Sequence, residues 1–322
     1  MKKIRFKKLA CIALSALVTA VLASGCAAEE KYPSGDITLS VAAGAGGDTD
    51  TYARILAQYM EEPLGVSVAI TNNGDGSGTI ACRDVHNADN DGYNAVFFHA
   101  SYILNEISGI TDLSLTDNFT IVSTPVVDTT SCIVANGHKF KDREDFFERA
   151  RSGEEIIAAI APGSYAHLAC LQLEDALGAN FKYVVVQNAS ERVTEMLADR
   201  IDVYFTQYSQ IEQYCQTNDF ICLGIMAPER NPFFEDIPTF PEQGIDITLE
   251  KVFYVAFPPE TDPEIVNTFA SALEQAIANP ECQEAFAKFY VEPKYMSPED
   301  SLEYLKELSA EYEKYADQLK GA

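Results

Sequence analysis

The chain alternates short strand-like runs with segments of helical period, and glycine-rich turns separate them. Residues 37–41 alternate apolar and polar side chains, as a half-buried strand does. The apolar residues of 55–60 then recur at helical spacing, and Pro63-Leu64-Gly65 ends that helix. Residues 44–50 lie between the two segments and carry three glycines followed by Asp-Thr-Asp. Asp48, Thr49 and Asp50 are each acceptable as the N-cap of the helix.

A strand, a glycine-rich turn and a helix start direct backbone N–H groups toward one point. The positive end of the helix dipole lies behind these groups, which makes the turn suitable for an anion. A plain connecting turn fits this stretch alone equally well.

The same rhythm repeats along the chain and predicts an α/β fold. In parallel sheets, ligands gather beyond the carboxyl ends of the strands. The pattern predicts two lobes of mostly parallel sheet flanked by helices, with the second lobe inserted into the first. Lobe 1 comprises 36–130 and 250–322, and lobe 2 comprises 131–249. We expect strands at 66–71, 93–98, 119–127, 131–135, 156–160, 183–186, 201–205, 221–226 and 252–257, and helices at 79–88, 142–151, 165–177, 188–199, 263–278 and 298–319.

Two of the expected helices begin with residues suited to capping. Ser164 follows a Pro-Gly turn and stands where it can cap the helix of 165–177. Asn188 precedes Glu191 by three positions, which is the spacing of a capping box.

The N-terminus has the pattern of an export signal. A basic segment, 1–8, precedes about fourteen apolar residues, which are too few to span a bilayer comfortably. Leu22-Ala23-Ser24-Gly25-Cys26 then resembles the lipobox of bacterial lipoproteins. This resemblance implies cleavage of a signal peptide, 1–25, and a lipid on Cys26 that anchors the protein to the membrane outside the cytoplasm, with 26–35 as anchor and tether. A plain signal peptide is the alternative.

The remaining chain is strongly acidic. The full sequence has a formal net charge of −26, and without residues 1–25 it retains 18 basic and 49 acidic residues. Such a surface argues against nucleic acid or anionic lipid as a partner. No lysine or arginine occurs in 36–53, 84–138 or 152–181, so the expected cleft loops offer amides, hydroxyls and carboxamides. An anion site here would use short-range hydrogen bonds and helix dipoles.

Six cysteines lie beyond Cys26, and their pattern leaves two interpretations open. They are Cys82, Cys132, Cys170, Cys215, Cys222 and Cys282. No Cys-x-x-Cys or Cys/His cluster occurs, so we expect no metal site. Disulfides are possible outside the cell, with Cys215 and Cys222 as the nearest pair, but packed thiols fit as well.

Several stretches together resemble the solute-binding proteins of tripartite tricarboxylate transporters, in the order and at about the spacing of that family across 32–290. They are Tyr32-Pro33, Gly46-Gly47-Asp48-Thr49-Asp50 with Arg54, Leu64-Gly65 leading to Asn72, Gly78-Thr79-Ile80, Asp91-Gly92-Tyr93, Pro162-Gly163-Ser164 with His167-Leu168, Asp202-Val203, Asp236-Ile237-Pro238-Thr239 and Glu242-Gln243-Gly244.

The resemblance implies a two-lobed, hinge-closing protein of the periplasmic-binding-protein type II (Venus flytrap) fold. It implies capture of a small carboxylate, such as a di- or tricarboxylate, outside the cell and delivery to a membrane permease. It implies no cofactor, and we expect a monomer. The ligand-binding residues that it implies are Ala43, Gly44, Ala45, Gly46, Gly47, Asp48, Asp50, Ser101, Gly163, Ser164, His167, Gln187, Asn188 and Thr206.

The sequence departs from the family at three places. Val186-Gln187-Asn188 replaces a Tyr-Lys-Gly-like run, the 163–167 loop is a residue or two short, and no tryptophan stands near Phe253. These departures concern the identity of the ligand more than the fold.

Other classes of protein fit the sequence less well. Ser164 and His167 suggest a hydrolase, but no Gly-x-Ser-x-Gly surrounds any serine, so we expect no catalytic residue. A dinucleotide fingerprint lacks its third glycine because Thr49 stands there. Asp75, Asp84, Asp89 and Asp91 do not have EF-hand spacing. A ligand-occupied sensor that signals to a membrane partner remains open, because it needs the same closing cleft.

Overall fold

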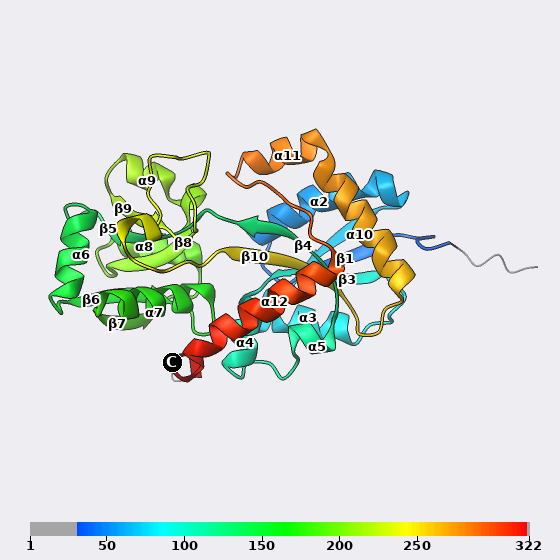
Figure 1. Ribbon diagram of the computed structural model, residues 1–322, viewed down its shortest axis with the longest axis horizontal. Helices are drawn as coiled ribbons and strands as arrows, with labels where there is room; N and C mark the ends of the chain where they lie inside the picture. The colour runs from blue at the N-terminus through cyan, green and yellow to red at the C-terminus, as the bar shows by residue number, and fades with distance from the viewer. Residues whose placement is uncertain (1–30, 321–322) are drawn as a thin grey trace, which may run out of the picture.

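The computed structural model describes residues 31–320, which form two lobes joined by crossing strands (Figure 1). The expected signal peptide and Cys26 lie outside the described residues. Within 31–320, no helix has the length and apolar character needed to cross a membrane. The two-lobed α/β fold predicted from the sequence is confirmed.

Lobe 1 is built on a five-stranded mixed sheet. β1 pairs in parallel with β2 and β3, whereas β10 runs antiparallel to β3 and β4. In spatial order the strands are β2 (Val68–Asn72), β1 (Ile37–Val41), β3 (Asn94–His99), β10 (Lys251–Phe257) and β4 (Thr120–Asp128).

Lobe 2 repeats this arrangement with the middle part of the chain. β6 pairs in parallel with β7 and β8, and β5 runs antiparallel to β8 and β9. In spatial order the strands are β7 (Asn180–Val185), β6 (Glu155–Ile160), β8 (Val203–Gln207), β5 (Ser131–Asn136) and β9 (Phe220–Ile225). Each sheet is therefore half parallel, rather than mostly parallel, because β10 and β5 enter from the other lobe.

Helices cover both sheets. In lobe 1, α2 packs with α10 and α11, while α12 lies along β4 (Figure 1). Lobe 1 carries α2 (Asp48–Leu64), α3 (Thr79–His86), α4 (Ser101–Ile107), α5 (Leu115–Asn118), α10 (Pro263–Ala278), α11 (Pro280–Ala287), α12 (Pro298–Tyr312) and α13 (Ala316–Lys320), and lobe 2 carries α6 (Arg143–Arg151), α7 (Tyr165–Leu177), α8 (Ala189–Leu197) and α9 (Glu212–Gln216). Four short 3-10 turns complete the chain: η1 (Asp75–Gly78), η2 (Tyr208–Gln210), η3 (Pro241–Gln243) and η4 (Glu313–Tyr315).

The strand β10 lies in the core of lobe 1, because all seven of its residues are buried. Phe253 stacks on Phe97 of β3 with ring centroids 5.6 Å apart, and its edge meets Tyr52 of α2. Covering a strand on both faces explains why its sequence, Lys-Val-Phe-Tyr-Val-Ala-Phe, is a continuous apolar run after the first residue. The lysine at the start of this run is the exception, and it lies at the ligand pocket described below.

The chain crosses between the lobes where β4 leads to β5 and where β9 leads to β10. Asp128, at the end of β4, is the register partner of Lys251, at the start of β10. The C-terminal α13 packs on α4 of lobe 1 and on α7 of lobe 2. The two lobes are thus connected both by these strands and by the C-terminus.

Most predicted elements are present, with shifts of one to three residues at their ends. The helix expected at 298–319 is interrupted after Tyr312, and α4, α5, α9 and α11 have no counterpart in the prediction. The six described cysteines are all free thiols, and only Cys215 is not fully buried. Between the two interpretations of the cysteines, the structure supports packed thiols.

Candidate ligand-binding site

A cavity of about 490 Å³ lies between the lobes and is lined by both of them. This volume is within the range of small-molecule pockets. Lobe 1 contributes the loops after β1, β2 and β3, and lobe 2 contributes the loops after β6, β7 and β8. Each of these strands points its carboxyl end at the cavity, as expected for parallel strands in an α/β fold.

Close packing of loops forms the lobe 1 wall. Gly78 has a φ of 83°, and a Cβ at this position would lie 2.5 Å from the Ala42 carbonyl oxygen and 2.6 Å from the Phe98 ring. Only glycine therefore fits where α3 begins beside the end of β1. This contact brings the start of α3 to the edge of the cavity.

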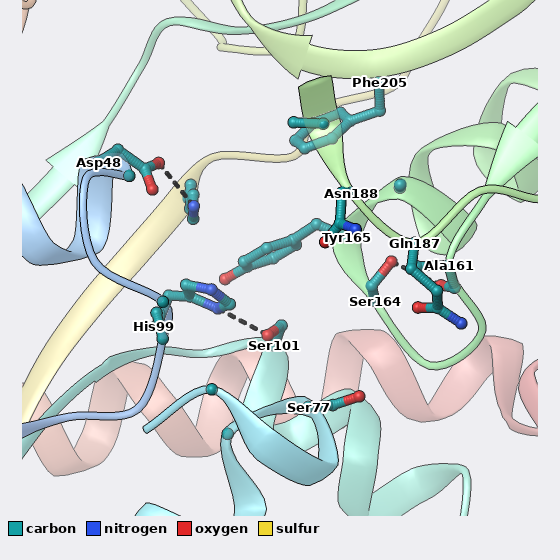
Figure 2. A pocket seen from close by; sticks show the side chains of 18 of the residues that line it. Asp48, Ser77, His99, Ser101, Ala161, Ser164, Tyr165, Gln187, Asn188 and Phe205 are labelled. Atoms are coloured by element: carbon teal, nitrogen blue, oxygen red, sulfur yellow. Dashed lines mark hydrogen bonds and ion pairs between the residues drawn. The ribbon is translucent and has the colours of Figure 1, made fainter. Parts of the chain in front are cut away.

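A buried ion pair lies in the lobe 1 half of the pocket. The Lys251 Nζ is 2.6 Å from the Asp48 Oδ2, and the two side chains are only 10% and 18% exposed (Figure 2). Burial opposes ionisation of Asp48, but the Lys251 ammonium outweighs this effect and lowers the pKa of the carboxyl. Asp48 also accepts a hydrogen bond from the Thr49 N–H at 2.7 Å, in the first turn of α2.

His99 and Ser101 form a hydrogen-bonded pair next to this ion pair. The His99 Nδ1 and the Ser101 Oγ are 2.6 Å apart (Figure 2). Burial lowers the pKa of His99 well below its ordinary value, and the Lys251 charge lowers it further. The imidazole is consequently neutral, so the pair adds polarity to the pocket without adding charge.

Two helix N-termini from lobe 2 face the cavity, and no side chain caps either one. Ser164 occupies the N-cap position of α7, but its hydroxyl donates to the Ala161 carbonyl at 2.6 Å instead of accepting from the helix. Asn188 occupies the N-cap position of α8 and makes no capping hydrogen bond. The capping roles expected for these two residues are therefore wrong. The first-turn N–H groups of both helices are left without a side-chain partner.

The guanidinium of Arg192 lies behind the start of α8. Its Nε donates to the Val186 carbonyl at 2.9 Å, and one terminal nitrogen donates to the Gln187 carbonyl at 3.1 Å. The residue is 7% exposed, and burial lowers the pKa of Arg192. An arginine starts several pKa units above neutrality, so it keeps its charge.

The lobes meet at one end of the pocket. Gly163, with a φ of 66°, has so little space that a Cβ would lie 2.8 Å from the Ile110 side chain of lobe 1. The Tyr165 ring extends from α7 toward His99, and the two ring centroids are 5.6 Å apart (Figure 2). These contacts bound the cavity at this end.

The structure brings ten of the fourteen expected ligand-binding residues to the lining of this pocket. They are Ala43, Gly44, Gly47, Asp48, Ser101, Gly163, Ser164, Gln187, Asn188 and Thr206. Contact of these residues with a ligand stays a prediction.

The other four expected residues lie outside the lining. Ala45 and Gly46 are exposed to solvent at the outer edge of their loop. Asp50 is occupied within lobe 1, where its carboxylate accepts from the Gly46 N–H and the Asn72 side chain and pairs with Arg54 at 3.0 Å. His167 is 1% exposed and packs edge-on against Tyr183. His167 lies outside the lining because its side chain points from α7 into the interior of lobe 2.

The sequence reasoning also missed residues in the lining. The expectation of a cleft without lysine or arginine is wrong, because Lys251 and Arg192 both line it. Arg192 lies four positions after Asn188, one helical turn along the same face, and this spacing was an available signal. Lys251 directly precedes an expected strand, but its orientation depends on the register with β4. Also missed were Ser77, His99, Asn105, Tyr165, Gln207 and Gln210.

The geometry does not support the hydrolase or metal interpretations within residues 31–320. Ser164 bonds to a carbonyl and the His167 Nδ1 has no hydrogen-bond partner, so these two side chains do not form a nucleophile–base pair. No group of three or more His, Cys, Asp or Glu side chains suited to a metal ion occurs in this part of the chain.

Known proteins resemble this chain over most of its length. One relative is the UPF0065 protein in the TAR-I ttuE-ttuC' intergenic region of Agrobacterium vitis, 26% identical with 91% of this chain and 86% of the relative covered. The solved structure of MatC from Rhodopseudomonas palustris with bound malate has a TM-score of 0.76 at 22% identity, covering 88% of this chain and 100% of that one. Another R. palustris protein, solved with adipate, has a TM-score of 0.78 at 20% identity, covering 90% and 98%. At these identities the two structures support the fold alone.

The family of the chain follows from a match to a family model. A model described as the tripartite tricarboxylate transporter family receptor matches residues 52–319, which is most of the chain. This family was expected from the ordered motifs of the sequence. The chain therefore belongs to the receptors of the tripartite tricarboxylate transporter family.

Proposed function

We propose that this protein captures a small carboxylate outside the cytoplasm, in the pocket between its lobes, and delivers it to a transporter permease in the membrane. The observation that carries the proposal is the charge of the pocket. The whole chain has a net charge of −26, yet the lining contains two basic residues, Arg192 and Lys251, and one acidic residue, Asp48. A positive pocket in so acidic a protein favours an anionic ligand.

The uncapped helix N-termini support the same ligand. Anions are stabilised at a helix N-terminus by the free N–H groups and by the helix dipole. These groups act over short distances, whereas the surface charges of the protein are screened by salt beyond about 8 Å. A carboxylate can thus bind despite the long-range repulsion from the acidic surface.

The relatives support the class of ligand and the partner. Malate is bound in one solved relative and adipate in another, and both are small carboxylates. The family is described as a receptor of a tripartite transporter, so we propose a membrane permease as the partner to which the closed protein delivers its ligand.

The proposed location rests on the family and on the N-terminal sequence. Cys26 follows a lipobox-like segment, and we propose that its sulfur carries the lipid anchor. The substitution Cys26→Ala should release the protein into the medium, whereas retention at the membrane would contradict the proposed lipid anchor.

A melting experiment tests the proposed ligand class. Protein lacking residues 1–26 is heated with di- and tricarboxylates, hydroxy acids and aromatic acids, and with the neutral methyl esters of the same acids as controls. Ligands that bind only the folded state stabilise it by about 2.7 kcal/mol at a concentration of 100 Kd. We expect one or a few acids to raise Tm and their esters to have no effect. A rise with only neutral sugars, esters or cations would contradict the proposal.

A further inference from the structure

The two halves of the pocket differ in charge. In the lobe 2 half, Arg192 is the charged residue of the lining, and no acidic residue accompanies it. In the lobe 1 half, the ammonium of Lys251 is already paired with Asp48 at 2.6 Å. Because an ion pair leaves little net charge, the unbalanced positive charge of the lining is concentrated near Arg192 and the starts of α7 and α8.

A further buried carboxyl group lies beside the ion pair. Asp128 is fully buried on β4, as the register partner of Lys251, and accepts hydrogen bonds from the Tyr52 hydroxyl and the Thr130 N–H. Burial raises the pKa of Asp128, and the negative charge of Asp48 raises it further. A ligand carboxylate in the lobe 1 half would be the third carboxyl group around a single ammonium, which is unfavourable in a poorly solvated site.

The other polar groups of the lobe 1 half are neutral, and one is an acceptor without a partner. Asn105 is 1% exposed and lines the pocket, and its Oδ1 has no hydrogen-bond partner within the described chain. Its Nδ2 donates to the Ser77 carbonyl at 3.1 Å, which fixes the orientation of the amide. A buried acceptor of this kind repels a carboxylate and favours a ligand hydroxyl or N–H.

Donors are also present in this half, and a neutral ligand group can use them. The N-terminus of α3 has no side-chain cap, and Gly78 at its N-cap lines the cavity. The oxygen of a hydroxyl accepts from such N–H groups and donates its own hydrogen to an acceptor such as Asn105. The lobe 1 half is therefore complementary to a hydroxyl-like end rather than to a second anion.

We propose that the ligand is a singly charged organic acid, bound with its carboxylate at Arg192 and the starts of α7 and α8 in lobe 2 and with a neutral, hydrogen-bond-donating end at Asn105 in lobe 1. This inference rests on the proposed capture of a carboxylate. It narrows that function, because a dicarboxylate of the same length places its second charge beside Asp48. In this arrangement Asp48 selects against a second charge by holding Lys251 in the ion pair.

Pairs of acids of equal length test the inference with the protein lacking residues 1–26. Calorimetric titration compares 4-hydroxybutanoate with succinate and 5-hydroxypentanoate with glutarate, at pH 7.5 and fixed salt. We expect the hydroxy acid of the better-fitting length to bind about tenfold more tightly than its dicarboxylate. Equal or tighter binding of the dicarboxylate in both pairs would overturn the inference while leaving the capture of a carboxylate intact. If no acid binds in either pair or in the melting experiment, the proposed function itself fails.

A charge substitution makes the test more specific. Asp48→Asn frees the Lys251 ammonium and should shift the preference about tenfold toward the dicarboxylate. Asp112→Asn is the matched control, since Asp112 pairs with Arg83 at 2.5 Å outside the pocket lining and is exposed. It removes the same charge from the protein and should leave the preference unchanged. An equal shift in both variants would show an effect of net charge alone and would contradict the role of Asp48. The wild-type comparison of acids remains decisive if Asp48→Asn fails to fold.

Discussion

Among the helices of eight or more residues, those that begin at the pocket and those that begin elsewhere differ in how their N-termini are satisfied. Away from the pocket, α6, α10, α11 and α12 are each capped by the side chain of their N-cap residue, namely Asp142, Asp262, Asn279 and Ser297. At the pocket, α3, α7 and α8 have Gly78, Ser164 and Asn188 at the N-cap, and none of these side chains makes a capping hydrogen bond.

This difference indicates which kind of group the pocket binds. A missing cap costs about 1 kcal/mol of stability, so three uncapped helices represent a measurable loss. Ser164 and Asn188 are residues that commonly cap helices, and yet Ser164 bonds to Ala161 instead. At α3 and α7 the Thr79 and His167 N–H groups already donate to the Gly76 and Ser164 carbonyls. The remaining first-turn N–H groups at the pocket are left for a ligand, and a ligand that binds them recovers the stability. The helix α2 is intermediate, because the carboxylate of Asp48 already occupies its first turn.

The largest effect is expected from removing the charge behind α8. Arg192→Met should weaken binding of the best acid by about 30- to 100-fold, because it removes a buried charge partner of the carboxylate. Arg192→Lys keeps the charge and should restore part of the affinity, and a melting curve of each variant controls for damage to the 186–188 loop. Titration calorimetry measures both. An unchanged affinity in Arg192→Met would exclude Arg192 from the site.

A smaller effect is expected from giving a pocket helix the kind of cap found elsewhere. Asn188→Asp places a carboxylate at the start of α8, where the helix dipole favours it by about 0.5 kcal/mol. The same carboxylate repels the ligand and occupies its donors, so the affinity should fall about tenfold. Stability and affinity would then change in opposite directions, as urea unfolding and calorimetry can measure. A gain in affinity would show that no anion binds at this helix.

The smallest effect is expected from removing a cap away from the pocket. The side chain of Asp262 accepts from the Glu264 N–H at 2.8 Å, at the start of α10. Asp262→Ala should lower the free energy of unfolding by about 1 kcal/mol through loss of this cap. Affinity for the acid should not change, because Asp262 does not line the cavity. A change in affinity as large as that of Asn188→Asp would remove the distinction between the two sets of helices.

The fold was largely predictable from the sequence, and particular residues show why. Gly178 marks the end of α7 and Pro263 marks the start of α10, and both helices have the boundaries that the pattern predicted. The helix α4 was missed because only Ala100 separates its start, Ser101, from the end of β3, without a turn signal, and because it spans only seven residues. The mixed character of the sheets depends on β10 and β5 crossing between lobes, and hydrophobic periodicity carries no information on strand direction.

The site was predictable where a loop follows a strand and not where a side chain is positioned by packing. The loops that hold Gly44, Ser164 and Asn188 could be identified from local sequence alone. Lys251 could not, since its place in the pocket depends on a partner 203 positions away in the chain. Cap formation was also mispredicted. Ser164 is a residue type that commonly caps helices and stands at the N-cap position, but its hydroxyl donates to the Ala161 carbonyl instead.

A crystal structure with the best-binding acid from the melting experiment tests the central claim most directly. The account predicts that a ligand carboxylate lies about 2.7–3.2 Å from main-chain nitrogens at the starts of α7 and α8, within reach of Arg192. A carboxylate held by Lys251 in lobe 1, with the starts of α7 and α8 bonded only to water, would contradict it.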